Sequence, residues 1–456
     1  MITPKPSPRP DKVSVWRYLR LFRQDILSAQ PQRLYRAWMA EFKTPFFRSY
    51  LINQPDLIDI VLKERPDDFP KSNRIGEGLR PLVGNSVFLT NGEVWKRQRR
   101  IIDPAFEGGR LKEAFPAMVE AARAAVERLD EKVKMDGTVE VEEIASHAAA
   151  DVIFRTLFSV PIEDRVASQV FSAFRDYQRT QPILNLAAFL PLPHWMPRFR
   201  KRETRRTART IRALITQMTT KRQAEIADGT APEDLATKIM TTRDPETGKT
   251  FTTDEMVDQV AIFFLAGHET SASALGWALY LVAADPATQE AVFAELANLN
   301  MTEIIFSDLS KMPITRDVFR ETLRLYPPVP MMVRETQKPE HFRNRVLPKT
   351  AQVVISPWHV QRHERFWDRP DAFDPSRWQT PEGRQSAREA YLPFSKGRRV
   401  CTGAGFAMAE GVVLLAMLIK AFRFETVAGR APVPIAHLTV RSKDGIWLTV
   451  TPREVC

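Results

Sequence analysis

The stretch FSKGRRVCTG, which spans Phe394 to Gly403, contains one of only two cysteines in this chain of 456 residues. Basic residues precede Cys401, and a thiolate is stabilised by nearby positive charge. The glycines let the backbone approach the sulfur closely. The apolar stretch GFAMAEGVVLLAMLIKAF follows and favours a helix, whose N-terminal dipole end also stabilises an anion. One local soft ligand does not suit zinc, but it is the pattern of an axial ligand to haem iron.

The alternative interpretation is that Cys401 is a small buried apolar residue, as free cysteine often is. The spacing Phe394-x-x-Gly397-x-Arg399-x-Cys401-x-Gly403 favours the haem interpretation. It resembles, without a departure, the haem-binding signature of the cytochrome P-450 superfamily, the haem-thiolate monooxygenases. The resemblance implies that Cys401 ligates the iron of haem b, and that the other four residues of the spacing bind the cofactor. Dioxygen is the implied co-substrate.

A second motif, AGHETS, begins at Ala266 in the middle of a long predicted apolar helix. A solvated polar patch is the alternative, but apolar residues surround the motif on most faces, and buried polar groups without a function are costly. The motif resembles the family's distal helix, in which an acid and an alcohol handle protons. The resemblance implies that Glu269 and Thr270 are this catalytic pair, and that Ala266 and Gly267 leave room for dioxygen. It assigns no role to His268.

A third motif, ETLRLYPPVP, places Glu321 and Arg324 on one face of a helix that the prolines end. As an exposed ion pair it would contribute about 0–1 kcal/mol. The segment instead resembles the family's ExxR helix, whose third partner is a downstream arginine. FDPSRW supplies Arg377, although Ser376 stands where the family usually has glutamate. The resemblance implies a structural triad of Glu321, Arg324 and Arg377 that stabilises the core beside the cysteine.

Haem carries two propionates, and buried carboxylates need hydrogen-bond donors, at about 1.5–3 kcal/mol for each charged bond. The resemblance implies Trp95 and Arg99, which share one helix face in GEVWKRQRR, together with Arg334 and Arg399. For Arg99 the alternative is a solvated basic helix face, because other basic residues flank it. The tryptophan at the right offset favours the haem role.

The pattern of the whole chain predicts mostly helix with small sheets at one side. Helices are expected over 109–133, 141–158, 202–226 and 253–286, and strands over 46–54, 351–358 and 445–453. No Rossmann alternation and no glycine-rich phosphate loop occurs. With the resemblance, the expected fold is mainly α with small β-sheets, a single haem-thiolate monooxygenase domain over 21–456 with a long central distal helix. Residues 1–20 are expected to be a flexible lead-in.

Composition indicates the compartment of the protein and the partners that it can have. Two cysteines fit a reducing cytoplasm, and the charged, proline-rich N-terminus lacks the apolar core of a signal peptide. No uninterrupted run of 18 apolar residues occurs, so no stable membrane insertion is expected. The formal charge of +11 comes with no nucleic-acid motif. We therefore expect a soluble, cytoplasmic, monomeric protein of bacterial type. The roles of His268 and of the terminal Cys456 stay open.

The function that the resemblance implies is monooxygenation of a hydrophobic small molecule such as a fatty acid, terpene, steroid-like or aromatic compound. The pocket residues implied are Phe88, Phe263, Val329, Met331 and Met332, with further segments at 75–88, 184–189 and 442–446. Electrons are expected from a separate acidic ferredoxin or flavodoxin and its reductase, docked on basic residues near the cysteine: Arg97, Arg100, Lys396 and Arg398. Two alternatives remain, a peroxide-driven peroxygenase and a non-enzymatic haem-binding or gas-sensing protein.

Overall fold

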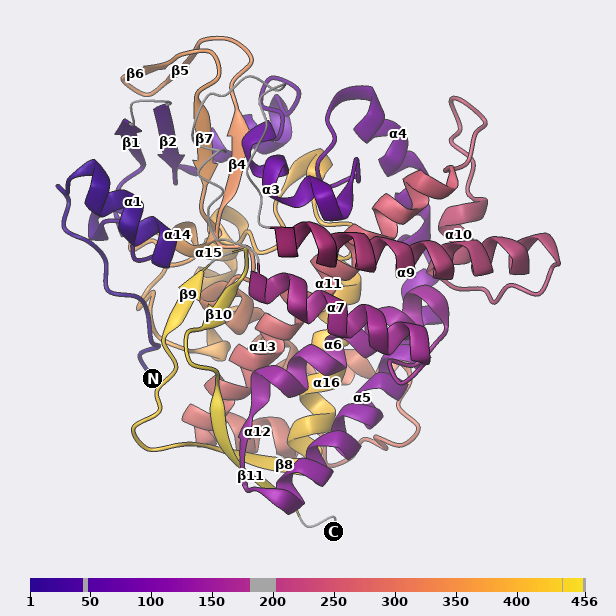
Figure 1. Cartoon of the computed structure of the whole chain (residues 1–456). Coiled ribbons are helices and arrows are strands. Elements are labelled where there is room, and N and C mark those ends of the chain that lie inside the picture. Colours follow the sequence, from indigo (N-terminus) through magenta and orange to yellow (C-terminus); the bar gives the residue numbers. More distant parts are fainter. Residues whose placement is uncertain (44–47, 181–201, 437, 454–456) are drawn as a thin grey trace.

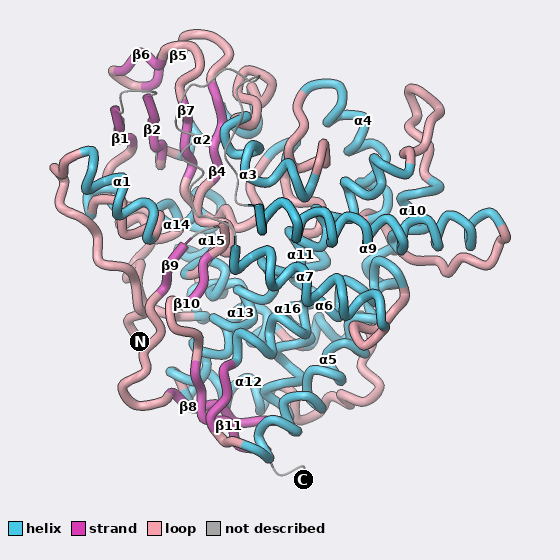
Figure 2. Tube along the Cα trace, viewed as in Figure 1, coloured by secondary structure: helices cyan, strands magenta, loops and turns pink. Residues whose placement is uncertain are grey.

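Helices form most of the structure, and small sheets lie along one side of it (Figures 1 and 2). The structure is a computed structural model that describes residues 1–43, 48–180, 202–436 and 438–453. The mainly helical fold class expected from the sequence is confirmed. The helices are α1 (Val15–Gln24), α2 (Pro55–Asp59), α3 (Asn73–Val83), α4 (Gly92–Ile102), α5 (Arg110–Met135), α6 (Val141–Phe158), α7 (Arg165–Thr180), α9 (Arg202–Ala227), α10 (Leu235–Thr241), α11 (Thr253–Ala284), α12 (Pro286–Glu295), α13 (Pro313–Leu325), α14 (Pro357–Val360), α15 (Pro381–Ala390) and α16 (Ala404–Ala421).

The strands are short and are distributed over four sheets. They are β1 (Met39–Lys43), β2 (Arg48–Ile52), β3 (Thr138–Glu140), β4 (Met332–Glu335), β5 (Glu340–Phe342), β6 (Arg345–Leu347), β7 (Gln352–Ile355), β8 (Phe422–Thr426), β9 (Pro434–Ala436), β10 (Val440–Ser442) and β11 (Trp447–Pro452). The largest sheet has the order β1-β2-β7-β4, in which β2 lies parallel to β7 with Ser49 opposite Gln352. This sheet carries Arg334, on β4, to the central cavity.

Helix α11 is the centre of the core. A capping box starts it, because the Thr252 hydroxyl accepts from the Glu255 N–H while the Glu255 carboxylate accepts from the Thr252 N–H. Its residues are apolar on nearly all faces, and α6, α9, α13 and α16 pack around it. Gly267 permits the close approach of α6, since a Cβ there would lie 2.9 Å from Ile153 Cδ1. The buried environment expected for the AGHETS motif therefore follows from packing on several sides.

Helix α16 follows the cysteine segment and is also a core helix. It is the one helix in the described ranges that is long and apolar enough to cross a membrane, and two thirds of it (67%) are buried inside the protein. Gly411 brings it against α13, where a Cβ would overlap the Phe319 ring at 2.0 Å. Its apolar character is thus used in packing against neighbouring helices.

The first residues of the chain, expected to be a lead-in, make contacts with distant segments. The Thr3 N–H donates to the Asp371 carbonyl at 2.9 Å, and the Tyr326 hydroxyl donates to the Pro4 carbonyl at 2.8 Å. The segment then continues into α1, which starts at a Ser14 cap. Backbone and side-chain groups that are distant in sequence therefore contact this segment, which the local composition did not reveal.

Candidate active site

The cysteine segment is a tight loop fixed by backbone hydrogen bonds. The Cys401 N–H donates to the Phe394 carbonyl at 3.0 Å, and the Val400 N–H donates to the Gly397 carbonyl at 3.0 Å. Gly397 has a φ of 70°, and a Cβ there would lie 2.1 Å from the Leu62 carbonyl oxygen. Only glycine fits this position, because both the backbone conformation and the contact exclude a side chain. The glycine in the motif thus sets the position of the cysteine.

Cys401 borders a cavity of about 1510 Å³. Burial raises the pKa of its thiol above the usual value, and the Gly403 N–H and the charges of Arg99 and Lys71 partly offset this effect. A Cβ at Gly403 would meet no atom within 4 Å, so the backbone beside the sulfur faces open space. A flat group could therefore lie against the backbone next to the thiol.

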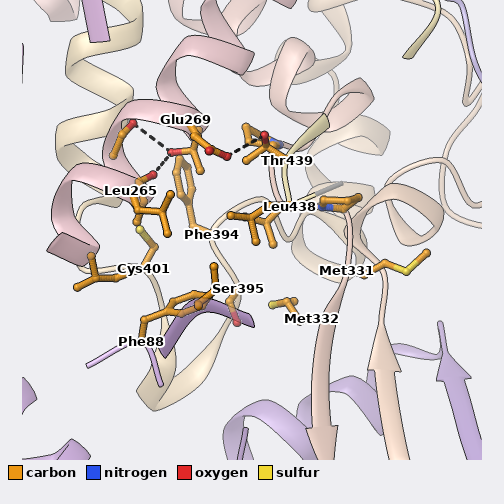
Figure 3. Close-up of a pocket in the computed structure, with 18 of the residues that line it drawn as sticks. Phe88, Leu265, Glu269, Met331, Met332, Phe394, Ser395, Cys401, Leu438 and Thr439 are labelled. Atoms are coloured by element: carbon orange, nitrogen blue, oxygen red, sulfur yellow. Dashed lines mark hydrogen bonds between the residues drawn. The ribbon is translucent and has the colours of Figure 1, made fainter. Parts of the chain in front are cut away.

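The cavity brings together most of the expected pocket residues (Figure 3). The residues that line it as expected are Phe88, Phe263, Ala266, Val329, Met331 and Met332. Segment 184–189 lies outside the described residues. The loop 442–446 does not line the cavity, because Ser442 and Ile446 are buried against α6 and the Ser442 N–H donates to Glu142. The turn before β10 borders the cavity in its place, through Leu438 and Thr439, together with Arg441 of β10.

Helix α11 forms the cavity wall that carries the expected acid and alcohol. The Thr270 hydroxyl donates to the Ala266 carbonyl at 2.6 Å. Glu269 is 5% exposed, accepts from the Thr439 hydroxyl at 3.3 Å and lies 3.5 Å from an Arg441 nitrogen (Figure 3). Burial raises the pKa of Glu269 above its usual value, although the Arg441 charge opposes this effect.

His268, for which the sequence suggested no role, points away from this pair. Its Nε2 lies 2.8 Å from the Ser146 hydroxyl of α6, and the Phe171 ring packs edge-on against its own. Burial lowers the pKa of His268 to about 3, so the ring is neutral. The structure gives it a packing role between α6, α7 and α11.

Three cations meet at one end of the cavity: Arg334, which is buried, and Lys71 and Arg399, which are half-buried. In the described part of the chain, Lys71, Arg334 and Arg399 have no acidic partner within ion-pair distance, and their hydrogen bonds go to backbone carbonyls and the Asn91 amide. Burial, reinforced by mutual repulsion for Lys71 and Arg399, lowers the pKa of each: to about 10 for each arginine and well below the usual value for Lys71. Arg399 Nη1 is buried without a hydrogen-bond partner. An uncompensated buried charge is costly, so this end of the cavity is built for an anion.

Trp95 and Arg99 of α4 also line the end of the cavity where the three cations lie. The Arg399 guanidinium lies 4.1 Å from the centroid of the Trp95 ring. Arg99 also lines the cavity, but its Nε is 2.9 Å from Asp103 and its Nη1 donates to the Val400 carbonyl at 2.9 Å. Arg99 therefore also ties α4 to the cysteine loop, which its position in a basic run did not indicate.

These features fit haem b. Its two propionates match the unpaired cations, its ring matches the open face beside Gly403, and its iron matches the thiol of Cys401. Lys71 was not predicted from the sequence, since no local pattern distinguishes it from other surface lysines. The signal that reveals it is structural: a half-buried lysine that lines the cavity and has no carboxylate within ion-pair distance in the described part of the chain.

The structure also brings together Glu321, Arg324 and Arg377. Arg324 Nη2 lies 2.8 Å and Arg377 Nε lies 2.9 Å from Glu321 Oε1. Glu321 and Arg324 are 0% exposed. Arg324 further donates to the carbonyls of Pro370 and Ala372. The arrangement clamps the segment that precedes the cysteine loop onto α13, as expected for a structural triad.

The basic residues near the cysteine are arranged differently from expectation. Arg97 Nη1 lies 2.6 Å from Glu255, and Arg100 pairs with Asp244 at 2.5 Å, so both charges are used within the protein. Lys396 and Arg398 each have an acidic neighbour at 3.3 Å, and the Arg398 side chain is 62% exposed. Of the four residues, these two present charge beside the cysteine loop.

Comparison with known proteins agrees with the site. The sequence matches the family profile described as Cytochrome P450 over residues 29–454. Human Cytochrome P450 4A11 is 30% identical over 412 residues, which cover 86% of this chain and 78% of the relative. The Taurochenodeoxycholic 6 alpha-hydroxylase of Sus scrofa is 29% identical over 419 residues, covering 88% and 81%. The crystal structure of the cytochrome P450DA heme domain superposes with a TM-score of 0.83 at 21% identity, covering 100% of this chain and 99% of that one, which shows the same fold.

The family match extends over nearly the whole chain, and the thiol, the unpaired cations and the α11 acid–alcohol pair surround one cavity. Haem b is the cofactor, dioxygen is the co-substrate, and the electrons come from a separate redox partner, as is typical of such enzymes. The chain belongs to the cytochrome P450 family and is a haem-thiolate monooxygenase that oxidises a hydrophobic organic substrate.

Proposed function

We propose that Cys401 Sγ ligates the haem iron, and that Trp95, Arg99, Arg334 and Arg399 bind the propionates together with Lys71. The observation that carries this assignment is the single cavity with a thiol on one wall and unpaired cations at one end. Phe394, Gly397 and Gly403 hold the loop that presents the sulfur. When bound, haem supplies the chemistry that activates dioxygen, and a thiolate ligand favours O–O cleavage.

The chain's own residues then manage protons and water. Glu269 is buried at the cavity, where burial raises its pKa above the usual value and Arg441 opposes this, and it can take up and release a proton there. The Thr270 hydroxyl, bonded to the Ala266 carbonyl, can accept a hydrogen bond from a neighbouring donor while it donates its own. The apolar side chains around the cavity exclude bulk water. Glu269 and Thr270 are therefore the proposed catalytic pair.

The proposed substrate is an uncharged or amphipathic hydrophobic molecule of steroid or long-chain size. The cavity wall is formed largely by apolar side chains, including Phe88, Phe263, Val329 and Met331, and about 1510 Å³ exceeds the volume of many small-molecule pockets, part of it being the place of the haem. The name of one relative, a taurochenodeoxycholic 6 alpha-hydroxylase, points to such a substrate for that protein. Spectral titration with fatty acids, terpenes and steroid acids tests this, and preference for small polar ligands would contradict it.

The proposed electron donor is an acidic ferredoxin or flavodoxin that docks beside Lys396 and Arg398. The exposed charge at Arg398 and the formal charge of +11 support an acidic partner. We further propose one domain over 21–456 and a soluble, monomeric, cytoplasmic protein of bacterial type, consistent with two cysteines and a charged N-terminus. Cell fractionation tests the location, and recovery from the membrane fraction would contradict it.

The first experiment is an absorbance spectrum of the reduced, carbon monoxide-treated protein. Thiolate ligation predicts a strongly red-shifted Soret band that Cys401→Ala abolishes. Cys456→Ala is the matched control, because it removes the other cysteine of the chain and should leave the band unchanged. A band typical of histidine ligation, unaffected by Cys401→Ala, would overturn the proposed ligand.

A further inference from the structure

Asn91 is the N-cap residue of α4, the helix that carries Trp95 and Arg99, but its side chain does not cap that helix. Asparagine is favoured at an N-cap because its side-chain oxygen accepts a hydrogen bond from a backbone N–H of the first helical turn. Asn91 forms no such bond, although its backbone has the extended conformation of an N-cap. Its amide is therefore used for another purpose.

Three hydrogen bonds of the Asn91 side chain join separate parts of the chain. Its Oδ1 accepts from the Lys71 N–H at 3.0 Å and from Arg399 Nη2 at 2.8 Å, and its Nδ2 donates to the Lys71 carbonyl at 3.1 Å. Two donors at the oxygen and a carbonyl at the nitrogen fix the orientation of the amide. Asn91 thus links residue 71, the start of α4 and the cysteine loop.

The hydrogen bonds of the Lys71 and Arg399 side chains go to neutral acceptors. The Lys71 ammonium donates to the Phe88 carbonyl at 2.6 Å, and Arg399 Nη2 donates to the Thr90 carbonyl at 3.1 Å as well as to Asn91. A carboxylate in place of this amide would form a stronger, charge-assisted bond, but it would also neutralise the guanidinium. A neutral amide orients Arg399 and leaves its positive charge for another anion.

We propose that Asn91 is a positioning residue of the haem site, which holds Arg399 and the backbone of Lys71 in place for the haem propionates while it adds no charge of its own. Asn91 does not border the cavity, so it acts through these two residues. The proposal rests on the proposed haem-binding roles of Lys71, Arg399 and Cys401. Both the shape and the neutrality of the Asn91 side chain should then be needed.

Two substitutions separate the shape of Asn91 from its neutrality. Asn91→Leu removes all three hydrogen bonds and adds no charge. Asn91→Asp has nearly the same shape and keeps the two bonds to its oxygen, but it places a carboxylate against Arg399. The matched control is Asn85→Asp, in the same connection between α3 and α4. Asn85 Oδ1 accepts from Arg80 at 2.5 Å, and neither of these two residues borders the cavity.

Haem transfer from the haem-loaded enzyme to an acceptor protein measures how firmly the cofactor is held. Transfer should be about 10-fold faster in Asn91→Leu, because loss of a residue that orients ligand-binding groups typically costs about 10–100-fold in affinity. Transfer should be at least as fast in Asn91→Asp, because the new carboxylate pairs with Arg399 and competes with a propionate. Asn85→Asp should match the wild type.

The reduction potential of the haem iron gives a readout that a purely structural role would not change. A negative charge added beside the site disfavours the uptake of an electron. The potential should therefore be lower in Asn91→Asp than in the wild type, in Asn91→Leu and in Asn85→Asp. Circular dichroism spectra show whether each variant is folded. Asn91→Asp, whose shape is almost unchanged, keeps the test available if Asn91→Leu does not fold.

The competing explanation is that Asn91 only ties the three segments together. In that case Asn91→Asp, which keeps two of the three bonds, would lose haem more slowly than Asn91→Leu. That result, a wild-type transfer rate in Asn91→Asp, or an unchanged potential in Asn91→Asp would overturn the proposal. Failure of the proposed function is distinguishable, because the wild-type protein would then lack the red-shifted band with carbon monoxide. All three variants should retain that band.

Discussion

At the scale of single residues, Thr270 combines a structural and a chemical role. Its hydroxyl donates to the carbonyl of the preceding turn, a bond that helical threonines commonly make. What distinguishes it is its surroundings: it borders the same cavity as Cys401 and follows a buried acid. Its role therefore depends on where the fold places α11.

Replacement of Thr270 by alanine should uncouple electron use from product formation. Loss of a positioned proton donor or acceptor costs about 10²–10⁴-fold in the assisted step, so product per electron should fall at least about 10-fold, with peroxide released instead. Thr216→Ala is the control, because Thr216 makes the same bond to the preceding turn at 2.8 Å on exposed α9. Equal coupling in the two variants would contradict the role of Thr270.

Lys71 provides a second prediction at this scale. If its charge is balanced by a haem propionate, Lys71→Met should weaken haem binding by about 10-fold or more, because a charge-assisted hydrogen bond contributes about 1.5–3 kcal/mol. Haem transfer to an acceptor protein measures this loss. Lys96→Met, at an exposed lysine paired with Glu93, should leave the transfer rate unchanged. A faster haem loss in the control than in Lys71→Met would exclude the assignment.

At the scale of elements, periodicity and caps were sufficient to predict α5, α6, α9 and α11 closely. Features set by distant contacts could not be predicted in this way. The packing of the first residues on Asp371 and the entry of Leu438 into the cavity both depend on partners far away in sequence. Local sequence reports how a segment folds, but not which cavity it faces. The motifs of known spacing were the exception, because the spacing itself carries the tertiary information.

The ion triad of Glu321, Arg324 and Arg377, which is called the clamp below, supports a stability prediction. Glu321→Gln should lower the free energy of unfolding by about 3–5 kcal/mol, because it leaves two buried guanidinium groups without their counter-charge. Asp130→Asn is the exposed counterpart, since Asp130 pairs with Lys134 at 2.6 Å on the surface of α5, and it should cost about 0–1 kcal/mol. Urea unfolding followed by circular dichroism gives both values. Similar costs for the two changes would mean that the clamp contributes little.

At the scale of the whole molecule, the charge beside the cysteine loop should steer an acidic partner. Reversal of Lys396 and Arg398 to glutamate should slow the first electron transfer about 10-fold at low salt, and the difference should shrink as salt screens the charges. The same double reversal at Arg209 and Lys221 on α9 is the control. Stopped-flow reduction at several salt concentrations measures the effect, and equal slowing by both pairs would argue against a local docking face.

Contacts between segments far apart in the sequence complete the fold around the cavity. Arg99 of α4 donates to the Val400 carbonyl, 301 residues later, and Thr3 donates to Asp371, 368 residues later. During translation the N-terminal residues of the cavity wall have no C-terminal partners to pack against until nearly all of the chain has left the ribosome. Haem can bind only then. A cell short of haem would hold a nearly complete chain with an open apolar interior, which chaperones and proteases recognise. The amount of this enzyme in a cell should therefore follow its supply of haem.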